Sequence, residues 1–443
     1  MTPALPLRDA IRCWSWLRRL ERPIAPRDPT PKRLFLLAFA VYWTIGEFIA
    51  EVHGHDHFDW FFNADVPRVV WDMTKTFYHA GSGAAVAHPL FVLLNLIAAP
   101  LARILDRSDL LAALALSHAA SALGVSLFYA VLRKLAVPRW FSLSASLVYL
   151  LATSNLVFGS IPETFSFIPC ALLLSIWVAL SSNKPMSNAG CGVFSLALNI
   201  ALLPHALFAA IVIWTQRSTF WQWCVRSARY WVCFAALAAT TFYLQHRLYP
   251  EMNPLDPGTR AAYEGYSEIP KTADALSKRG KRLLAHMVAF NIVAPRPLLR
   301  EPSKITTFMW EESEAMPAYS LLGKSVVAAW LVAFAFASYS NVRRLLQVRP
   351  EVRAVTILCG GWLFGVALLF LCFGDDLLLY SECWMAHVAL WVALGLGAER
   401  QWILARRAWP VLAAIFVLLL AINNAQFVRN MLHHYQTRPL IDL

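Results

Sequence analysis

The sequence predicts an all-α, polytopic membrane protein with about eleven transmembrane helices. Its 443 residues are 58% hydrophobic, and its mean hydropathy is +0.51. Only 15% of the residues are charged, well below the roughly 25% of soluble domains. Several apolar runs approach or exceed the ~20 residues that a helix needs to cross a bilayer. The 18 Trp, 13 Tyr and 27 Phe residues fit aromatic belts at the two membrane surfaces.

The net charge and the cysteine pattern bear on possible partners and metal sites. The net charge is +12, and basic cytoplasmic loops are the usual source of such an excess in a membrane protein. No basic run is interleaved with aromatic residues in a soluble segment, so we expect no nucleic-acid partner. The 8 cysteines are scattered, mostly in apolar segments, and none forms a CxxC pair. We expect them to be small buried side chains.

Three regions are expected along the chain. Residues 1–32 form a basic arm that is too long and too basic for a cleaved signal peptide, so it is expected to stay cytoplasmic. Residues 33–428 form a single transmembrane domain, and residues 429–443 form a short outer tail. The candidate helices are Arg33–Ala50, His88–Leu105, Leu110–Leu132, Trp140–Phe158, Thr164–Leu180, Gly190–Leu203, Ala206–Trp214, Ala228–His246, Ala318–Tyr339, Val352–Phe373, Leu377–Leu396 and Trp409–Val428.

The basic loops decide which of these helices cross. If all of them crossed, Arg133, Lys134 and Arg139 would lie outside, against the positive-inside rule. The conflict disappears if Pro89–Leu105 lies along the membrane surface or re-enters it. Pro204 interrupts an apolar block, and proline breaks helices, so two short helices are expected to meet there at the outer face. The resulting topology has about eleven spans, with the N-terminus inside and the C-terminus outside.

This topology places two long loops on the outer face, at residues 51–109 and 248–317, together with the turns Gly159–Glu163 and Gly374–Asp376. Outer loops of this length are usually functional or disordered. The later loop contains the basic stretch Lys278–Arg282, which is followed by apolar residues. This pattern predicts an interfacial helix beside anionic headgroups or phosphates.

A short amphipathic helix is predicted in the first outer loop, at Val66–Tyr78, because its apolar residues recur at helical spacing. Asp65 directly precedes it and has two interpretations. It is either the N-cap of this helix or a carboxylate that serves as a general base. Asp72 lies on the same side and is expected to face water near Lys75, although it could instead support Asp65.

His53, His55 and His57 alternate in the same loop. On an extended chain their imidazoles would point the same way, and histidine is a frequent metal ligand. Their spacing matches no fixed metal-binding motif, so a solvated loop is favoured over a transition-metal site.

The remaining candidates also lie at the predicted outer face. Glu163 is either a second rim carboxylate or the first-turn acid of a helix. His88 precedes a proline-marked helix start, and His205 follows a helix break where its imidazole is expected to be wet. Glu382 and His387, with Tyr380, lie near the start of a span, where ionisable groups are functional candidates. The alternative for that segment is interfacial anchoring by its aromatic residues.

This layout resembles the GT-C superfamily of polyprenyl-phosphate-sugar-dependent glycosyltransferases. The similarity is to its protein O-mannosyltransferase and lipid A aminoarabinose transferase branch. The matching pieces are Asn63-Ala64-Asp65, His88-Pro89-Leu90, Pro162-Glu163, the loop Leu248–Pro317 and the run from Asp375 to Ser381. The sequence departs from the family pattern in two places. Where the family has two consecutive prolines, this chain has Pro89-Leu90, and no Asp-Glu pair follows the first span.

The resemblance implies a sugar donor on an undecaprenyl or dolichyl phosphate, which enters from the bilayer. The acceptor would be a protein, a lipid or a glycan, and the location would be the bacterial inner membrane. Asp65 and Glu163 would be the catalytic pair and could hold Mg²⁺ or Mn²⁺ through oxygen ligands. The substrate-binding set would be Arg68, Lys75, His88, His205, Tyr380 and Glu382, with the stretch Lys278–Arg282 as a further phosphate-binding candidate.

Two other functions stay open at this stage. A secondary transporter would use Glu382 and His387 as proton-relay groups, but such proteins usually place ionisable residues at the midplane of inverted repeats. No matching halves stand out in this sequence. A non-catalytic subunit of an envelope-assembly complex is the third possibility.

Overall fold

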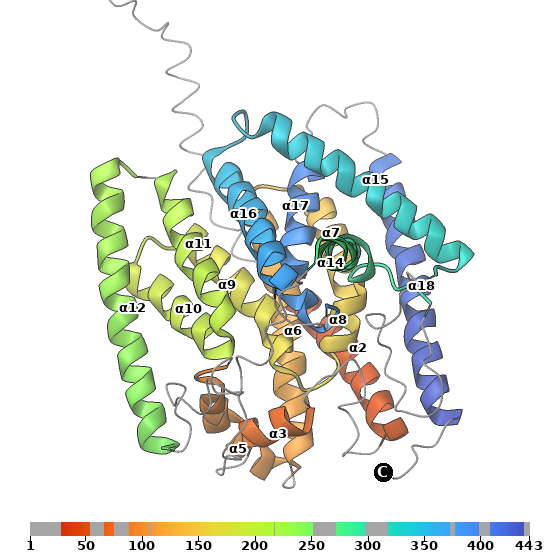
Figure 1. The fold of residues 1–443 in the computed structure, drawn as a ribbon, viewed down its shortest axis with the longest axis horizontal. Coiled ribbons are helices and arrows are strands. Elements are labelled where there is room, and N and C mark those ends of the chain that lie inside the picture. Colours follow the sequence, from red (N-terminus) through yellow and green to blue (C-terminus); the bar gives the residue numbers. More distant parts are fainter. Residues whose placement is uncertain are drawn as a thin grey trace, which may run out of the picture.

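The computed structural model describes residues 28–53, 66–74, 88–105, 108–216, 218–250, 272–296, 318–372, 377–397 and 408–437. These ranges are helical apart from their connections and contain no strand (Figure 1). Within them, six helices are long and apolar enough to cross a membrane: Thr30–Ala50, Asp109–Lys134, Thr164–Ser181, Leu321–Arg344, Pro350–Cys372 and Ala408–His433. The chain is therefore an all-α, multi-pass membrane protein, and the count of eleven spans stays a prediction.

The described elements keep one set of labels below. In chain order they are α2 (Thr30–His53), α3 (Val66–Thr74), η2 (Phe91–Leu94), α5 (Asn95–Ile104), α6 (Asp109–Lys134), α7 (Arg139–Leu151), α8 (Thr153–Phe158), η3 (Thr164–Phe167), α9 (Ile168–Ser181), α10 (Pro185–Leu198), η4 (Ile200–Leu202), α11 (Leu203–Thr215), α12 (Phe220–Leu248), α14 (Ala273–Ala285), η5 (His286–Phe290), α15 (Leu321–Arg344), α16 (Pro350–Cys372), η6 (Leu379–Cys383), α17 (Met385–Gly397) and α18 (Ala408–Thr437).

Helix α6 contacts α2, α5, α7 and α9 and so organises the middle of the bundle. The Ser108 side chain begins this helix by accepting a hydrogen bond from the Leu111 N–H. Arg133 and Lys134 occupy its last turn, where the helix dipole favours positive charge. Its buried face includes both apolar and small polar side chains, as expected for a helix surrounded by other helices.

The predicted helix over residues 140–158 is wrong as a single element, because it is divided into α7 and α8. At the break, the N–H groups of Thr153 and Ser154 donate to the carbonyls of Ile292 and Asn291. A segment more than a hundred residues away thus supplies the acceptors that a continuous helix would have provided itself. The sequence around the break does not contain this information.

The helix break predicted at Pro204 occurs earlier in the chain. Helix α10 ends at Leu198, and the Asn199 side chain accepts from the Ala201 N–H in the connection. Pro204 instead lies in the first turn of α11, where a missing N–H leaves no hydrogen bond unmade. The prediction of two short helices is confirmed, and only the position of the break is corrected.

One end of the bundle contains the short helices α3 and α5, and the other end contains a basic connection. Helices α3 and α5 lie together at the lower end in Figure 1, opposite the α11–α12 and α15–α16 connections. With 10 residues, α5 is too short to cross a bilayer, in agreement with the prediction that Pro89–Leu105 does not span. Arg343, Arg344, Arg349 and Arg353 flank the α15–α16 connection, so this basic loop lies away from α3, as the charge-based topology requires.

Candidate functional site

Helix α3 carries a buried ion pair at the lower end of the bundle. Arg68 Nη1 lies 3.1 Å from Asp72 Oδ2, one helical turn apart. The Asp72 side chain is 5% exposed and that of Arg68 is 20% exposed, so the expectation that Asp72 faces water is wrong. The cause is the packing of α3: Val69 and Met73 are fully buried, and the helix contacts α5, α6 and η2.

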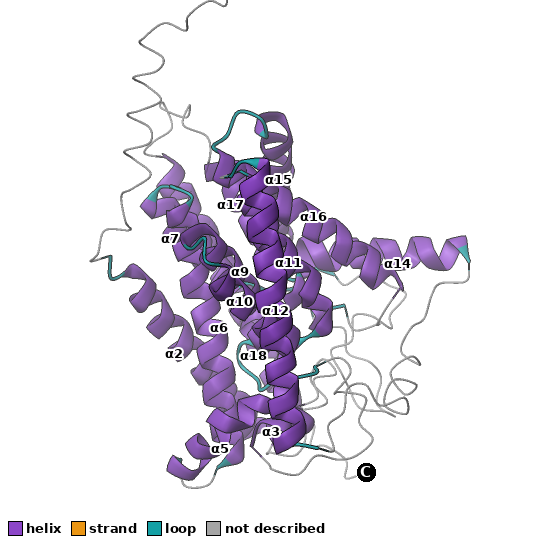
Figure 2. Cartoon of the chain, turned by 90° about the vertical axis from the view of Figure 1, so that its left-hand side faces the viewer, coloured by secondary structure: helices purple, strands orange, loops and turns teal. Residues whose placement is uncertain are grey.

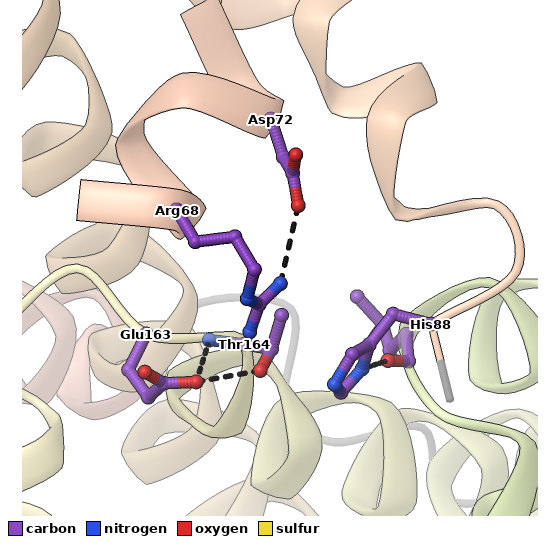
Figure 3. A network of polar contacts seen from close by, with 6 residues as sticks. Arg68, Asp72, His88, Glu163 and Thr164 are labelled. Atoms are coloured by element: carbon purple, nitrogen blue, oxygen red, sulfur yellow. Dashed lines mark hydrogen bonds and ion pairs between the residues drawn. The ribbon is translucent and has the colours of Figure 1, made fainter. Parts of the chain in front are cut away.

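Glu163 ends the turn between α8 and η3 and is 1% exposed. Its Oε1 accepts hydrogen bonds from the Thr164 N–H at 2.8 Å and from the Thr164 hydroxyl at 2.6 Å. The helix-start interpretation of this residue is therefore confirmed. In Figure 3 the Arg68 side chain points between Asp72 and the Glu163–Thr164 pair. The structure thus brings a cation and two buried carboxylates together from two distant segments.

His88 contacts the end of α10. Its Nδ1 lies 2.5 Å from the Leu198 carbonyl oxygen, and because a carbonyl only accepts, Nδ1 is the protonated ring nitrogen. The ring is buried and meets the rings of Phe91 and Phe165 edge-on, each at 6.3 Å between centroids. Figure 3 shows His88 beside the Glu163–Thr164 turn. His88 therefore belongs to the same region as Arg68 and Glu163.

An aromatic chain leads from this region to η6. The Phe165 ring contacts Tyr380 at 5.4 Å, and Tyr380 stacks on Phe370 of α16 at 4.7 Å. Element η6 contacts η3 and α8, which places Tyr380 and Glu382 next to the Glu163 turn in the fold. Two sequence candidates from the C-terminal part of the chain therefore lie beside candidates from its N-terminal half.

A buried polar cluster surrounds Glu382, which is 2% exposed. Its carboxylate lies near the side chain of Ser154, whose hydroxyl donates to the Asn291 carbonyl, and it interacts electrostatically with the Tyr42 and Tyr149 hydroxyls. Tyr42 Oη, Tyr149 Oη and Glu382 Oε1 have no hydrogen-bond partner among the described residues. Buried polar groups are rarely left in this state, so water or a ligand is expected to complete their hydrogen bonds.

Three members of this cluster were not among the sequence candidates. Tyr42 and Tyr149 lie inside apolar runs, where a tyrosine is usually an interfacial or core residue. Ser154 lies at the α7–α8 break, which depends on a distant segment. No local pattern in the sequence identifies any of the three.

His205 forms a second buried feature. Its Nε2 lies 2.8 Å from His387 Nε2, and both side chains are 0% exposed. The Trp362 ring packs against both imidazoles, with centroids at 5.0 and 5.9 Å. The expectation of a wet imidazole at a helix break is therefore wrong for His205. The pair connects α11 with α17 rather than presenting either ring to an outer loop.

Several candidates fall outside the described residues. They are Asp65, Lys75, His55, His57, Asp375 and Asp376, together with the side chain of His53. Within the described ranges, no group of three or more His, Cys, Asp or Glu side chains could hold a metal ion. Of the two carboxylates predicted to bind Mg²⁺ or Mn²⁺, Asp65 and Glu163, only Glu163 lies among the described residues.

No protein-family model matches this chain, and no curated protein is significantly similar to it. The function must therefore be argued from the site itself.

Proposed function

We propose that the protein is an integral-membrane glycosyltransferase that moves a sugar from a polyprenyl-phosphate donor to an acceptor hydroxyl at the outer face. The observation that supports this most is the convergence of Arg68, Asp72 and Glu163 at one end of the bundle. His88 and the cluster around Glu382 adjoin them. A charged and polar site at the end of apolar helices suits a donor whose tail lies in lipid and whose head is polar.

Arg68 is proposed to bind the donor phosphate. A guanidinium matches phosphate oxygens through its fork of N–H donors, and Asp72 fixes its position on α3. Sugar transfer converts the donor to a lipid phosphate, so positive charge at this point stabilises the leaving group. The pairing with Asp72 also holds Arg68 in one orientation before the donor arrives.

Asp65 is proposed to deprotonate the acceptor hydroxyl for attack at the anomeric carbon. General-base help of this kind contributes on the order of 10²–10⁴-fold. Asp65 immediately precedes Val66, the first residue of α3, and is therefore only three positions from Arg68 in the chain. A divalent cation, if bound, would be held by carboxylate oxygens of Asp65 and Glu163 and would add positive charge near the phosphate.

Glu382 and Tyr380 are proposed to bind the sugar hydroxyls. Carboxylate and phenol groups make hydrogen bonds with hydroxyls, and the orphaned atoms beside Glu382 leave such bonds to be made. His205 receives no such support, because its Nε2 is taken up by His387. We therefore remove His205 from the proposed substrate-binding set.

The decisive experiment compares Asp65→Asn with Asp274→Asn, a matched change at an exposed carboxylate on α14. Both variants are reconstituted with a synthetic polyprenyl-phosphate sugar, and the glycosylated product is identified by mass spectrometry with and without EDTA. We expect transfer to fall at least 100-fold in Asp65→Asn and to persist in Asp274→Asn. Undiminished transfer by Asp65→Asn, with unchanged thermal stability, would remove Asp65 from the mechanism.

The buried His205–His387 pair favours a second candidate, a proton-coupled secondary transporter. Two imidazoles that share one N–H inside a helix bundle are suited to passing a proton. Proteoliposomes loaded with a pH-sensitive dye separate the two functions. Solute uptake coupled to proton movement, without any glycosylated product, would favour the transporter.

A further inference from the structure

Helix α14 lies across the end of a candidate membrane span. Figure 2 shows it projecting sideways from the bundle, at a large angle to the long helices. Arg279 Nε donates to the Phe370 carbonyl at 3.2 Å, and Gly280 faces the Leu371 side chain. Phe370 and Leu371 belong to the last turn of α16, a 23-residue candidate span. This contact places α14 beside the end of α16.

One side of α14 is apolar and only partly covered. Leu283, which is 2% exposed, and Met287 in the following turn attach the helix to the bundle. Leu276 and Leu284 are 45% and 63% exposed, and they lie on the same side of the helix, about two turns apart and about 80° apart around its axis. Exposed leucines at the end of a membrane span are expected to enter the apolar boundary of the bilayer.

The opposite side of α14 is basic. Lys278 and Lys281 are both exposed, and at 100° per residue their mean direction is about 130° from that of Leu276 and Leu284. Lys278 pairs with Asp274 at 3.1 Å, but both side chains are largely exposed, so this pair contributes little stability. The helix therefore has an apolar side and a cationic side with water access.

We propose that α14 binds anionic phospholipid headgroups of the surrounding leaflet through Lys278 and Lys281, with Leu276 and Leu284 in the acyl boundary. Charge complementarity identifies the occupant: the partner must offer negative charge beside an apolar layer, and an anionic bilayer surface offers both. An acidic protein segment would satisfy the lysines alone and would leave the two leucines in water. The inference does not depend on the proposed sugar transfer.

The test uses the full chain in detergent and measures bound lipid by native mass spectrometry. Lys278→Gln/Lys281→Gln is compared with Lys32→Gln/Lys184→Gln, which removes the same charge from two exposed lysines, one on α2 and one directly before α10. The probes are phosphatidylglycerol, phosphatidylcholine and a polyprenyl phosphate, each titrated at low and high salt. At roughly fivefold per basic side chain, we expect the α14 variant to bind phosphatidylglycerol about 25-fold more weakly and the control to be little changed.

Three results would overturn the proposal. One is equal phosphatidylglycerol binding by the α14 variant and the wild type. Another is equal loss in the control variant, which would mean a non-specific charge effect. The third is loss of binding to a polyprenyl phosphate alone, with phosphatidylglycerol unaffected, which would assign the lysines to the donor. Thermal melting of all variants checks that the fold is retained.

Discussion

Arg68 and Asp72 form an ion pair across one turn of α3, with 3.1 Å between Nη1 and Oδ2. Because Asp72 is 5% exposed, loss of the Arg68 charge is expected to weaken the stabilisation of a buried carboxylate. The pair also orients Arg68 toward the Glu163 turn (Figure 3). The first prediction concerns the stability of this arrangement, independently of any reaction.

We expect Arg68→Gln to destabilise the protein more than the double change Arg68→Gln/Asp72→Asn. The single change takes the Arg68 charge away from the buried Asp72 carboxylate, at a cost of about 2 kcal/mol, whereas the double change removes both charges. The measurement is the thermal unfolding midpoint in one detergent. Equal midpoints for the single and double variants would mean that Asp72 is stabilised by other groups.

The second prediction separates two roles of Glu163. Glu163→Gln keeps an oxygen that accepts from the Thr164 N–H, so we expect near-normal stability. It removes the negative charge, so we expect transfer activity to fall at least tenfold if the carboxylate takes part in the reaction. Glu163→Ala loses the cap as well and should lower stability by about 1 kcal/mol. Full activity in Glu163→Gln would reduce Glu163 to a cap.

The long helices could be predicted from the sequence, because sustained apolar runs give a strong signal. Helix α16, expected at 352–373, spans Pro350–Cys372. The α7–α8 break could not be predicted, since it depends on acceptors at Asn291 and Ile292 that only the folded chain brings near. The local sequence predicts helices and their caps, but it does not predict helix breaks that depend on tertiary contacts.

In the candidate site too, local features could be predicted from the sequence and tertiary contacts could not. The helix start at Glu163 is a local feature that the sequence predicts as one of two alternatives, although Glu163 is the N-cap and not a first-turn residue. Arg68 and Asp72 have the i,i+4 spacing of a helical ion pair, which is visible in the sequence. The burial of Asp72 is visible only in the structure. The convergence of Tyr42 and Tyr149 on Glu382 joins three distant segments and has no local signature.

The third prediction concerns the crossing of α15 and α17. Gly395 lies so close to the backbone of Ala337 that an added Cβ would be 2.6 Å from Ala337 Cα. Gly395→Ala must therefore separate the helices, and overpacking of this kind costs about 1–3 kcal/mol. Gly361→Ala is the matched control, because nothing lies within 4 Å of its Cβ position. Thermal melting should show a lower midpoint for Gly395→Ala and an equal or higher one for Gly361→Ala, and the reverse order would contradict the close crossing.

The fourth prediction is that anionic lipid binding by α14 does not change between pH 5.5 and pH 8. His286 directly follows α14, and burial lowers its pKa to about 4, with the nearby Arg282 charge acting in the same direction. The imidazole therefore stays neutral throughout this range and adds no charge to the helix. Phosphatidylglycerol affinity, measured as above, should vary less than twofold. Binding that strengthens several-fold as the pH falls through 6.5 would show that His286 becomes charged and contributes to the basic side of the helix.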